Sequence, residues 1–317
     1  MQNVIETEAL CKTYGSHRVV DHLTLTVPEG CVYGFLGPNG AGKSTSMKMM
    51  LGLARPTSGS VELLGLVHPT GGTVRLLGKP MTDANRLALL QQTGSLIESP
   101  SGYLHLTARE NLEIVADLKG VSHKDIARVL DIVQLTRDQH RKVGQYSLGM
   151  KQRLGIAMAL LGSPKLLILD EPTNGLDPAG IQEMRELIRT MPAATGATVL
   201  ISSHLLGEME QMVEQVGIID HGRMLFEGSL TELQRHSRGD LTLRLLHPAK
   251  ALPVLCANGL PTADTGSTLT LPPLRDDLLA GLVQALADSG AGVVGLTQHT
   301  KTLEEIFLTL TAPKEVG

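Results

Sequence analysis

Short runs of alternating hydrophobic and polar residues open the chain and predict β-strands. The segments VIETEALCKTY and VVDHLTLTVPEG show this alternation, are separated by turn residues, and are followed by VYGFLG. After VYGFLG comes a glycine-rich turn and then STSMKMMLGLA, whose methionine and leucine spacing is typical of a helix. Residues 32–53 are therefore predicted to form a strand, a loop and a helix within a β-rich N-terminal region.

Further along the chain the hydrophobic spacing becomes helical. Helices are predicted for LTARENLEIVADL and HKDIARVLDIVQL, between residues 100 and 144, and for YSLGMKQRLGIAMALL. By contrast, LLILDEP at 166–172 begins with the uninterrupted apolar run of a buried strand. Beyond residue 228 the character changes to a helix and linker, a proline-dotted stretch and a second helical segment, which together predict a small α+β unit.

The composition is that of an ordinary soluble globular chain. It has 317 residues, of which 42% are hydrophobic and 19% charged, and this length predicts about two domains. Twenty-eight Lys and Arg against 32 Asp and Glu give a net charge of -4. Binding of nucleic acid or an anionic membrane through bulk charge is therefore not expected, and any anion must be bound locally.

The cysteines and the hydropathy bear on location. Cys11, Cys31 and Cys256 are far apart, odd in number and without metal-ligand spacing, which favours free thiols in a reducing cytoplasm. The first residues lack the apolar core of a signal peptide, and no stretch reaches the roughly 18 apolar residues of a spanning helix. We expect a cytoplasmic chain that does not itself cross a membrane.

The glycine-rich turn at residues 37–44 reads GPNGAGKS and fits the phosphate-loop pattern G-x-x-x-x-G-K-[ST]. Its glycines let successive backbone N–H groups point at phosphate oxygens, and the following helix adds its positive N-terminal end. Lys43 would contact the β- and γ-phosphates, and Ser44 would offer its hydroxyl to Mg²⁺. An accidental glycine-rich turn is the alternative, which the strand-to-helix setting disfavours.

Two carboxylates end the apolar run LLILDEP. Alternation along a strand would point Asp170 and Glu171 to opposite sides. One carboxylate could then hold Mg²⁺ or its water near Ser44, while the other faces the γ-phosphate and polarises an attacking water. The alternative is a strand that ends in solvated acids.

The segment YSLGMKQR, which precedes LLILDEP, suggests a second anion site. Ser147 is positioned as a helix N-cap, and Ser147 and Gly149 could offer a hydroxyl and a backbone N–H to phosphate. Taken alone, the segment is better interpreted as a capped helix. Together with the other motifs, however, the segment favours the anion site.

Several motifs occur in one order within residues 3–230: Tyr14, GPNGAGKST, YSLGMKQR, LLILDEP, NGLD at 174–177, and SSH ending at His204. Their order and spacing resemble the nucleotide-binding subunit of ATP-binding cassette (ABC) transporters. The resemblance implies an α/β fold: a P-loop NTPase core of ABC type with an antiparallel β subdomain, a helical subdomain and a small C-terminal α+β extension. The nucleotide-binding domain would span 1–228, with its helical subdomain at about 100–160, and the accessory extension 229–317.

The resemblance also implies how the site works. Two ATP molecules with Mg²⁺ would lie between the halves of a head-to-tail homodimer, in which the signature helix of one subunit completes the ATP site of the other. Tyr14 would stack on adenine, Asp177 would lie in the loop across the dimer interface, and His204 would sense the γ-phosphate. The expected catalytic residues are Glu171 and His204, and the expected metal ligands are Ser44, Asp170 and Glu98. Nucleotide contacts are expected from Tyr14, Gly37, Pro38, Asn39, Gly40, Ala41, Gly42, Lys43, Ser44, Thr45, Ser147, Gly149 and Asp177.

Two departures from the family pattern change the expected chemistry. The signature reads SLGMK where the family usually has SGGQ, so Leu148 and Met150 replace a glycine and a glutamine. Where the family has a glutamine that senses Mg²⁺, this chain has GSLIESP with Glu98, and a carboxylate there could tighten contact with Mg²⁺ or repel phosphate. In the alternative, Glu98 is a loop acid and Gln91 or Gln92 serves instead.

GSLIESP, YSLGMKQR and LTARENL at 106–112 are similar to the bacterial branch that exports bacitracin and lantibiotic-type peptides and confers self-immunity. In that branch the membrane part is a separate permease. The surface with Glu98 and Tyr103 is then the candidate docking site for its coupling helices. The ending KTLEEIFLTLT matches a common final helix of the group, and we expect the C-terminal extension to serve packing or dimer stability rather than regulatory binding.

A tandem repeat lies outside these motifs. LGLARPTSGSVELLG at 51–65 resembles LGLVHPTGGTVRLLG at 64–78, and the family pattern requires one copy. We expect about 13 residues to loop out or to form an extra hairpin, as a neutral insertion.

The sequence therefore predicts an ATPase that drives transport, with a lean to export, through a separate membrane subunit and without a nucleic-acid partner. Two alternatives remain open: a non-transport cassette ATPase that acts on ribosomes or DNA, and an immunity or regulatory module whose ATPase does not drive export. The chain shows neither a second cassette nor a long coiled-coil interruption, which disfavours the first alternative.

Overall fold

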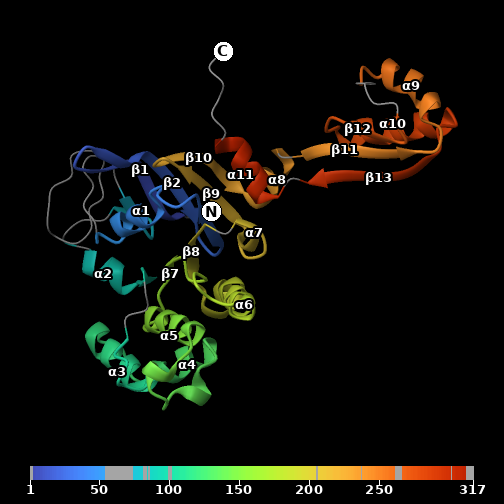
Figure 1. Cartoon of the computed structure of the whole chain (residues 1–317). Coiled ribbons are helices and arrows are strands. Elements are labelled where there is room, and N and C mark those ends of the chain that lie inside the picture. The colour runs from blue at the N-terminus through green and yellow to red at the C-terminus, as the bar shows by residue number, and fades with distance from the viewer. Residues whose placement is uncertain are drawn as a thin grey trace. The chain divides into compact units, whose positions relative to one another are not determined.

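The structure is a computed structural model that describes residues 3–53, 74–80, 84, 86–98, 102–204, 206–236, 238–260, 266–300 and 302–311. The chain divides into two compact units, Met1–Leu230 and Thr231–Ala312 (Figure 1). Each unit has its own hydrophobic core. Among the described residues, no helix combines the length and the apolar character that crossing a membrane requires.

An antiparallel sheet begins the first unit, where the alternating sequence predicts strands and the family resemblance implies an antiparallel β subdomain. Strands β1 (Asn3–Tyr14) and β2 (His17–Pro28) form a long hairpin, and β4 (Val74–Leu76) and β5 (Lys79–Pro80) complete the order β2-β1-β4-β5. Strand β4 ends the second copy of the tandem repeat. The rest of the expected loop or extra hairpin, residues 54–73, lies outside the described residues.

A mostly parallel sheet forms the centre of the first unit and has the order β10-β9-β3-β8-β7-β6. The strands β3, β6, β7, β8 and β9 are parallel, and β10 pairs antiparallel with β9. Strands β3, β7 and β8 are buried along their whole length. Strands β3 and β7 carry the apolar runs VYGFL and LLIL, and β8 carries VLI followed by two serines. Their carboxyl ends meet at one edge of the sheet. The strand bounds are β3 (Val32–Leu36), β6 (Thr93–Leu96), β7 (Leu166–Asp170), β8 (Thr198–Ser203), β9 (Gln215–Asp220) and β10 (Arg223–Ser229).

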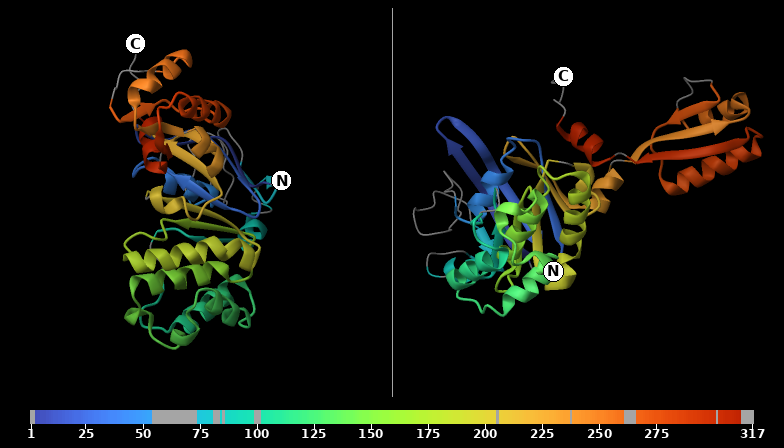
Figure 2. Two further views of the ribbon diagram at one scale, coloured as in Figure 1. Left: turned by 90° about the vertical axis from the view of Figure 1, so that its right-hand side faces the viewer. Right: turned by 60° about the horizontal axis from the view of Figure 1, so that its bottom comes forward.

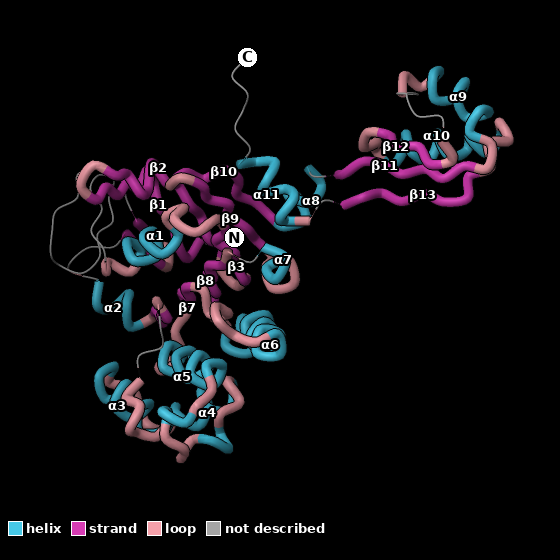
Figure 3. Tube along the Cα trace, viewed as in Figure 1, coloured by secondary structure: helices cyan, strands magenta, loops and turns pink. Residues whose placement is uncertain are grey.

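Helices follow the strands of this sheet and also form a separate helical part, as Figure 3 shows. Helix α1 (Lys43–Met50) comes directly after the glycine-rich loop, which confirms the predicted strand, loop and helix. Helices α3, α4 and α5 pack against one another, and α5 also contacts β6. The other bounds are α2 (Arg86–Gln91), α3 (Ala108–Lys119), α4 (Asp125–Ile132), α5 (Leu148–Leu160), α6 (Pro178–Thr195) and α7 (Leu206–Met209), with short 3-10 turns at Thr136–Asp138 and Val143–Gln145.

Both ends of the helical part are capped by side chains. At the start of α3, Thr107 and Glu110 form a reciprocal capping box. At the end of α5, the Lys119 ammonium donates to the carbonyls of Met158, Ala159 and Leu161 at 3.1, 3.2 and 3.2 Å. A cation at a helix C-terminus satisfies carbonyls that have no partner within the helix. The Lys119 contacts join the last residue of α3 to the end of α5, whose opposite end carries the signature residues.

The second unit has the α+β character that the sequence predicts. Its strands pair antiparallel in the order β12-β11-β13 (Figure 2). The leucines of β11 and β12 pack with those of α9 and α10. The bounds are α8 (Leu230–His236), β11 (Arg238–Leu245), α9 (Pro248–Ala257), β12 (Thr268–Leu271), α10 (Asp276–Asp288), β13 (Val293–Thr300) and α11 (Leu303–Thr311).

Candidate functional site

The phosphate loop connects the end of β3 to the start of α1. Gly40 and Gly42 have φ angles of 83° and 101°, in the left-handed region that glycine adopts without strain. A Cβ atom at Gly37 would lie 2.3 Å from the carbonyl oxygen of Ile219, so the close packing of this turn against β9 requires glycine. The pattern in the sequence thus corresponds to a loop whose backbone is exposed to an anion at the N-terminus of α1.

Lys43 is buried within this loop. Its ammonium donates to the carbonyls of Gly37 at 2.8 Å and Pro38 at 3.2 Å, and it lies 3.6 Å from Oε1 of Glu171. Burial lowers the pKa of Lys43 from its usual value, and the neighbouring Glu171 carboxylate opposes that shift. The charged form is therefore supported by one carboxylate and two carbonyl dipoles, in the place that a polyphosphate would occupy.

Asp170 ends β7 and is held by the neighbouring strand. The Ser202 hydroxyl donates to Oδ1 of Asp170 at 2.5 Å, and Ser202 Oγ also accepts the backbone N–H of Glu171 at 3.0 Å. This pairing follows the parallel register, in which Asp170 lies opposite Ser202. One serine therefore orders both acidic residues of the motif.

The orientation of Glu171 has a different cause from the one that the sequence predicted. The expectation that strand alternation separates the two carboxylates was wrong, because β7 ends at Asp170 and Glu171 has a left-handed φ of 46°. This turn brings Oε2 of Glu171 to 3.0 Å from Nδ1 of His204 and Oε1 to 3.6 Å from Lys43. The two carboxylates do take different partners, but a local backbone turn is the reason.

A pocket of about 660 Å³ lies beside these residues and is lined by Ser44, Asp170, Glu171 and Glu98, among others. A hydroxyl and carboxylates of this kind are the oxygen donors that Mg²⁺ prefers. Ser44 and Asp170 therefore fit a magnesium ion. When bound, such an ion would offset the charge of the β- and γ-phosphate oxygens.

Glu98 follows β6 in a left-handed conformation with φ of 65°. Its carboxylate pairs with Lys48 at 2.5 Å, and this ammonium lowers the pKa of the Glu98 carboxyl. Lys48 lies one turn after Ser44 on α1 and thereby places a positive charge beside the pocket. Gln91 and Gln92 lie before β6, at the opposite end of the strand from Glu98.

The signature residues lie at the N-terminus of α5. The Ser147 side chain accepts the backbone N–H of Met150 at 3.2 Å, which makes it the N-cap, while Ser147 and Gly149 are solvent-accessible. Leu148 approaches Gly175, where an added Cβ atom would lie 3.1 Å from the leucine Cδ2. Asp177 accepts the backbone N–H of Gly180 at 3.2 Å and caps α6.

Tyr14 ends β1 at the turn of the first hairpin, and its side chain is 52% exposed. The Lys12 ammonium lies 4.7 Å from the centre of the Tyr14 ring. The ring is therefore accessible for stacking on a planar base. The structure does not bring Tyr14, Ser147, Gly149 or Asp177 into the hydrogen-bonded group of Lys43, Asp170, Glu171 and His204.

Three further residues belong to this region and were not assigned roles from sequence. Ser202 orders the acidic pair, and Lys48 holds Glu98. Gln152 lines the pocket, and its buried Oε1 has no hydrogen-bond partner in the described part of the chain. Ser202 was visible in the SSH motif and Gln152 in YSLGMKQR, whereas Lys48 carries no signal that separates it from other helix residues.

These features define a P-loop nucleotide-binding site with a carboxylate and a histidine placed beside the phosphate-binding lysine. The family model described as "ABC transporter" matches residues 20–174. The chain is 46% identical to the bacitracin transport ATP-binding protein BcrA of Bacillus licheniformis over 323 residues, which cover 100% of both chains. This protein belongs to the ATP-binding subunits of ABC transporters, which hydrolyse ATP.

Other relatives support the same family. The lantibiotic transport ATP-binding protein SrtF of Streptococcus pyogenes is 43% identical over 71% of this chain and 90% of its own length. The daunorubicin/doxorubicin resistance ATP-binding protein DrrA of Streptomyces peucetius is 36% identical over 97% of this chain and 92% of its own. Among solved structures, an ATP-binding subunit of an ABC transporter superposes with a TM-score of 0.61 at 29% identity, over 74% of this chain and 92% of that one.

Proposed function

We propose that this protein hydrolyses Mg²⁺-ATP to drive export of, or immunity to, a peptide antibiotic or another amphiphilic compound through a separate membrane permease. The observation that carries the proposal is the position of Glu171 between Lys43 and His204 at the phosphate loop. The names of the bacitracin, lantibiotic and drug-resistance relatives support this class of cargo.

In the proposed site, the residues of the loop from Gly37 to Thr45 bind the triphosphate, and Lys43 offsets its charge. Glu171 accepts a proton from the attacking water, and His204 orients the Glu171 carboxylate and senses the γ-phosphate. The 3.0 Å contact between His204 and Glu171 supports this division of roles. Ser44 and Asp170 hold Mg²⁺, and Glu98 contributes a further carboxylate beside them.

We propose that two copies of this chain close on two ATP molecules. The exposed Ser147 and the half-buried Gly149 of one copy would meet the phosphates bound by the other, because a helix N-terminus attracts anions. Asp177 would lie at the same interface, where its capping of α6 fixes the loop that contains it. Tyr14 would stack on the adenine.

A loop beside the helical part is our proposed contact with the permease, at the cytoplasmic face of the membrane. Asn111 is buried and binds both the backbone N–H and the carbonyl of Tyr103, at 2.7 and 3.1 Å. This clamp fixes a loop that exposes Tyr103 and Leu104, each at 57%. Exposed apolar side chains on a fixed backbone are suited to bind a helix from another protein.

The experiment is affinity purification of the tagged chain from detergent-solubilised native membranes, with Mg²⁺-ATPase activity measured on the recovered complex. We expect a protein with several membrane spans to co-purify and the activity to remain with it. A matched Tyr103→Ala, Leu104→Ala variant should keep ATP binding and lose the membrane protein. Recovery of ribosomes or nucleic acid, or of no membrane protein at all, would contradict the transporter function.

A further inference from the structure

Asp21 on β2 is the centre of a charged network outside the pocket that Ser44, Asp170 and Glu171 line. Its side chain is 9% exposed. Oδ1 accepts a hydrogen bond from Arg18 at 2.8 Å and lies 2.8 Å from Nδ1 of His22, and Oδ2 accepts one from Nε of Arg223 at 2.6 Å. Arg223 begins β10, so this contact joins strands that are 202 residues apart in the sequence.

The same place joins three parts of the first unit through the backbone. The Asp21 N–H donates to the carbonyl of Gly222 at 2.9 Å, and the Gly222 N–H donates to the carbonyl of Ala41 in the phosphate loop at 3.0 Å. A Cβ atom at Gly222 or Gly42 would lie 2.5 or 2.7 Å from the carbonyl oxygen of Val19. Strand β2, the β9–β10 turn and the phosphate loop are therefore packed without room for a side chain between them.

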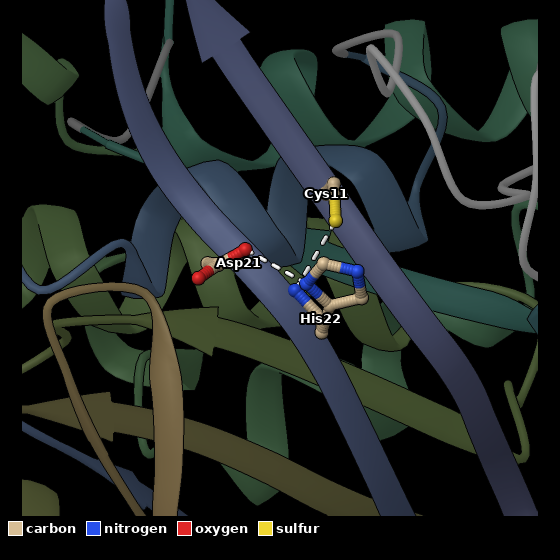
Figure 4. A group of neighbouring side chains, drawn as sticks. All are labelled: Cys11, Asp21 and His22. Carbon is tan, nitrogen blue, oxygen red and sulfur yellow. Dashed lines mark hydrogen bonds and ion pairs between the residues drawn. The ribbon is translucent and has the colours of Figure 1, made fainter.

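A metal site is the obvious alternative, because Cys11, Asp21 and His22 bring possible ligand atoms within 4.8 Å of one another (Figure 4). Two arginines already occupy both oxygens of Asp21, and their positive charges oppose a cation. The Cys11 sulfur accepts the backbone N–H of His22 at 3.1 Å. The same residues are thus satisfied by the protein itself, and the guanidinium groups hold the pKa of Asp21 well below its usual range.

We propose that Asp21 is a positioning residue for ATP, which sets the first hairpin, and Tyr14 with it, at a fixed distance from the phosphate loop. Tyr14 pairs with His17 at the closed end of the hairpin, and Asp21 lies further along β2. A ligand that contacts both the ring and the loop gains affinity only if the two are held in register. The inference rests on the proposed role of Tyr14 at the adenine.

The test compares two ligands of the full-length protein by competition for a fluorescent nucleotide. A non-hydrolysable ATP analogue needs both the hairpin and the phosphate loop, whereas inorganic tripolyphosphate needs the loop alone. Asp21→Asn keeps the shape of the side chain and removes its charge. We expect Asp21→Asn to lower the affinity for the ATP analogue about fivefold and to leave the affinity for tripolyphosphate unchanged. A fivefold change is on the scale of couplings between residues in one network.

Two further variants separate positioning from simple loss of structure. In a Tyr14→Ala background, Asp21→Asn should have no further effect on the ATP analogue, because the hairpin then contributes no contact. Arg223→Gln changes an exposed side chain and replaces Asp21→Asn in the test if that variant fails to fold. It should also lower the affinity for the ATP analogue. Asp117→Asn, which breaks an exposed pair with His123 in the helical part, is the control and should change neither affinity.

The positioning role would be overturned if Asp21→Asn lowered the affinity for both ligands equally. It would also be overturned if Asp21→Asn had the same effect in the Tyr14→Ala background as in the unmodified protein. A stoichiometric zinc content that disappears in Asp21→Asn would also overturn it in favour of a metal site. If the unmodified protein bound tripolyphosphate and ATP analogue equally well, Tyr14 would have no role at the base and the inference would fail with it. If neither ligand bound to the unmodified protein, the proposed ATP site itself would be refuted.

Discussion

Replacement of Glu171 by glutamine tests the central residue of the site. Glu171→Gln preserves the volume of the side chain and an oxygen that can accept a hydrogen bond, so the contacts at 3.0 Å to His204 and 3.6 Å to Lys43 need not be rebuilt. What disappears is the ability to accept a proton. We therefore expect the fold and the ATP site to persist while turnover falls.

The magnitude follows from the role. A positioned general base contributes about 10²- to 10⁴-fold to a rate, so kcat should fall by at least about 10²-fold, equivalent to about 2.7 kcal/mol of transition-state stabilisation. Affinity for ATP should be unchanged or slightly higher, because Glu171 is a negative charge beside the place where the γ-phosphate would lie. Loss of the carboxylate also removes the charge that opposes the lowered pKa of Lys43, but its two carbonyl contacts remain.

The assay is phosphate release under single-turnover conditions, paired with equilibrium binding of ATP to the same preparation. Glu186→Gln is the matched control, because Glu186 lies on the exposed face of α6 and pairs with Arg189. The control should keep full turnover. Turnover of Glu171→Gln within about threefold of the unmodified protein would refute the role of Glu171 as the base, and parallel loss of ATP binding would assign it to binding instead.

Three further predictions concern the framework of the site. Lys119→Met should destabilise the protein by about 1–3 kcal/mol in thermal unfolding, because three carbonyls at the end of α5 lose a charged donor; an unchanged midpoint would contradict the cap. Burial raises the pKa of the Cys31 thiol to about 11, so a thiol reagent at pH 8 should modify exposed Cys256 rapidly and Cys31 only after denaturation, which mass spectrometry of the labelled peptides can check. Arg128 lowers the pKa of the Asp125 carboxyl, so the stability that Asp125 adds should be present above its ordinary pKa of 3.8 and lost as pH falls through the lower folded value; unfolding of Asp125→Asn should differ from the unmodified protein at pH 6 and converge with it in acid.

Local order in the chain was predictable because it follows from short-range periodicity. Alternation predicted two strands where β1 and β2 lie, and the glycine-rich turn followed by helical spacing predicted β3, the phosphate loop and α1. The apolar run that ends at Asp170 predicted a buried strand, and the structure confirms it as β7. Each of these signals lies within about 20 residues of sequence.

The sequence predicted which residues form the candidate site, but it predicted their orientation less well. Lys43, Asp170, Glu171 and His204 were all named from their motifs, and the structure brings them together at one edge of the parallel sheet. The reason given for the orientation of Glu171 was wrong, because a single left-handed residue replaced the expected strand alternation. A backbone turn of one residue leaves no periodic pattern that a sequence can display.

Contacts between distant segments were decided only by the tertiary structure. Lys48 and Glu98 are 50 residues apart, and Asp21 and Arg223 are 202 residues apart. No local rule pairs one charge with another over such separations, because the pairing depends on which strands become neighbours and in which register. The sequence by itself determined the phosphate loop, the acidic strand end and the family. The order of strands in the folded sheet decided which charges pair. Hydrophobic burial selects that order, and the order then determines which polar side chains lie next to one another at the edge of the sheet.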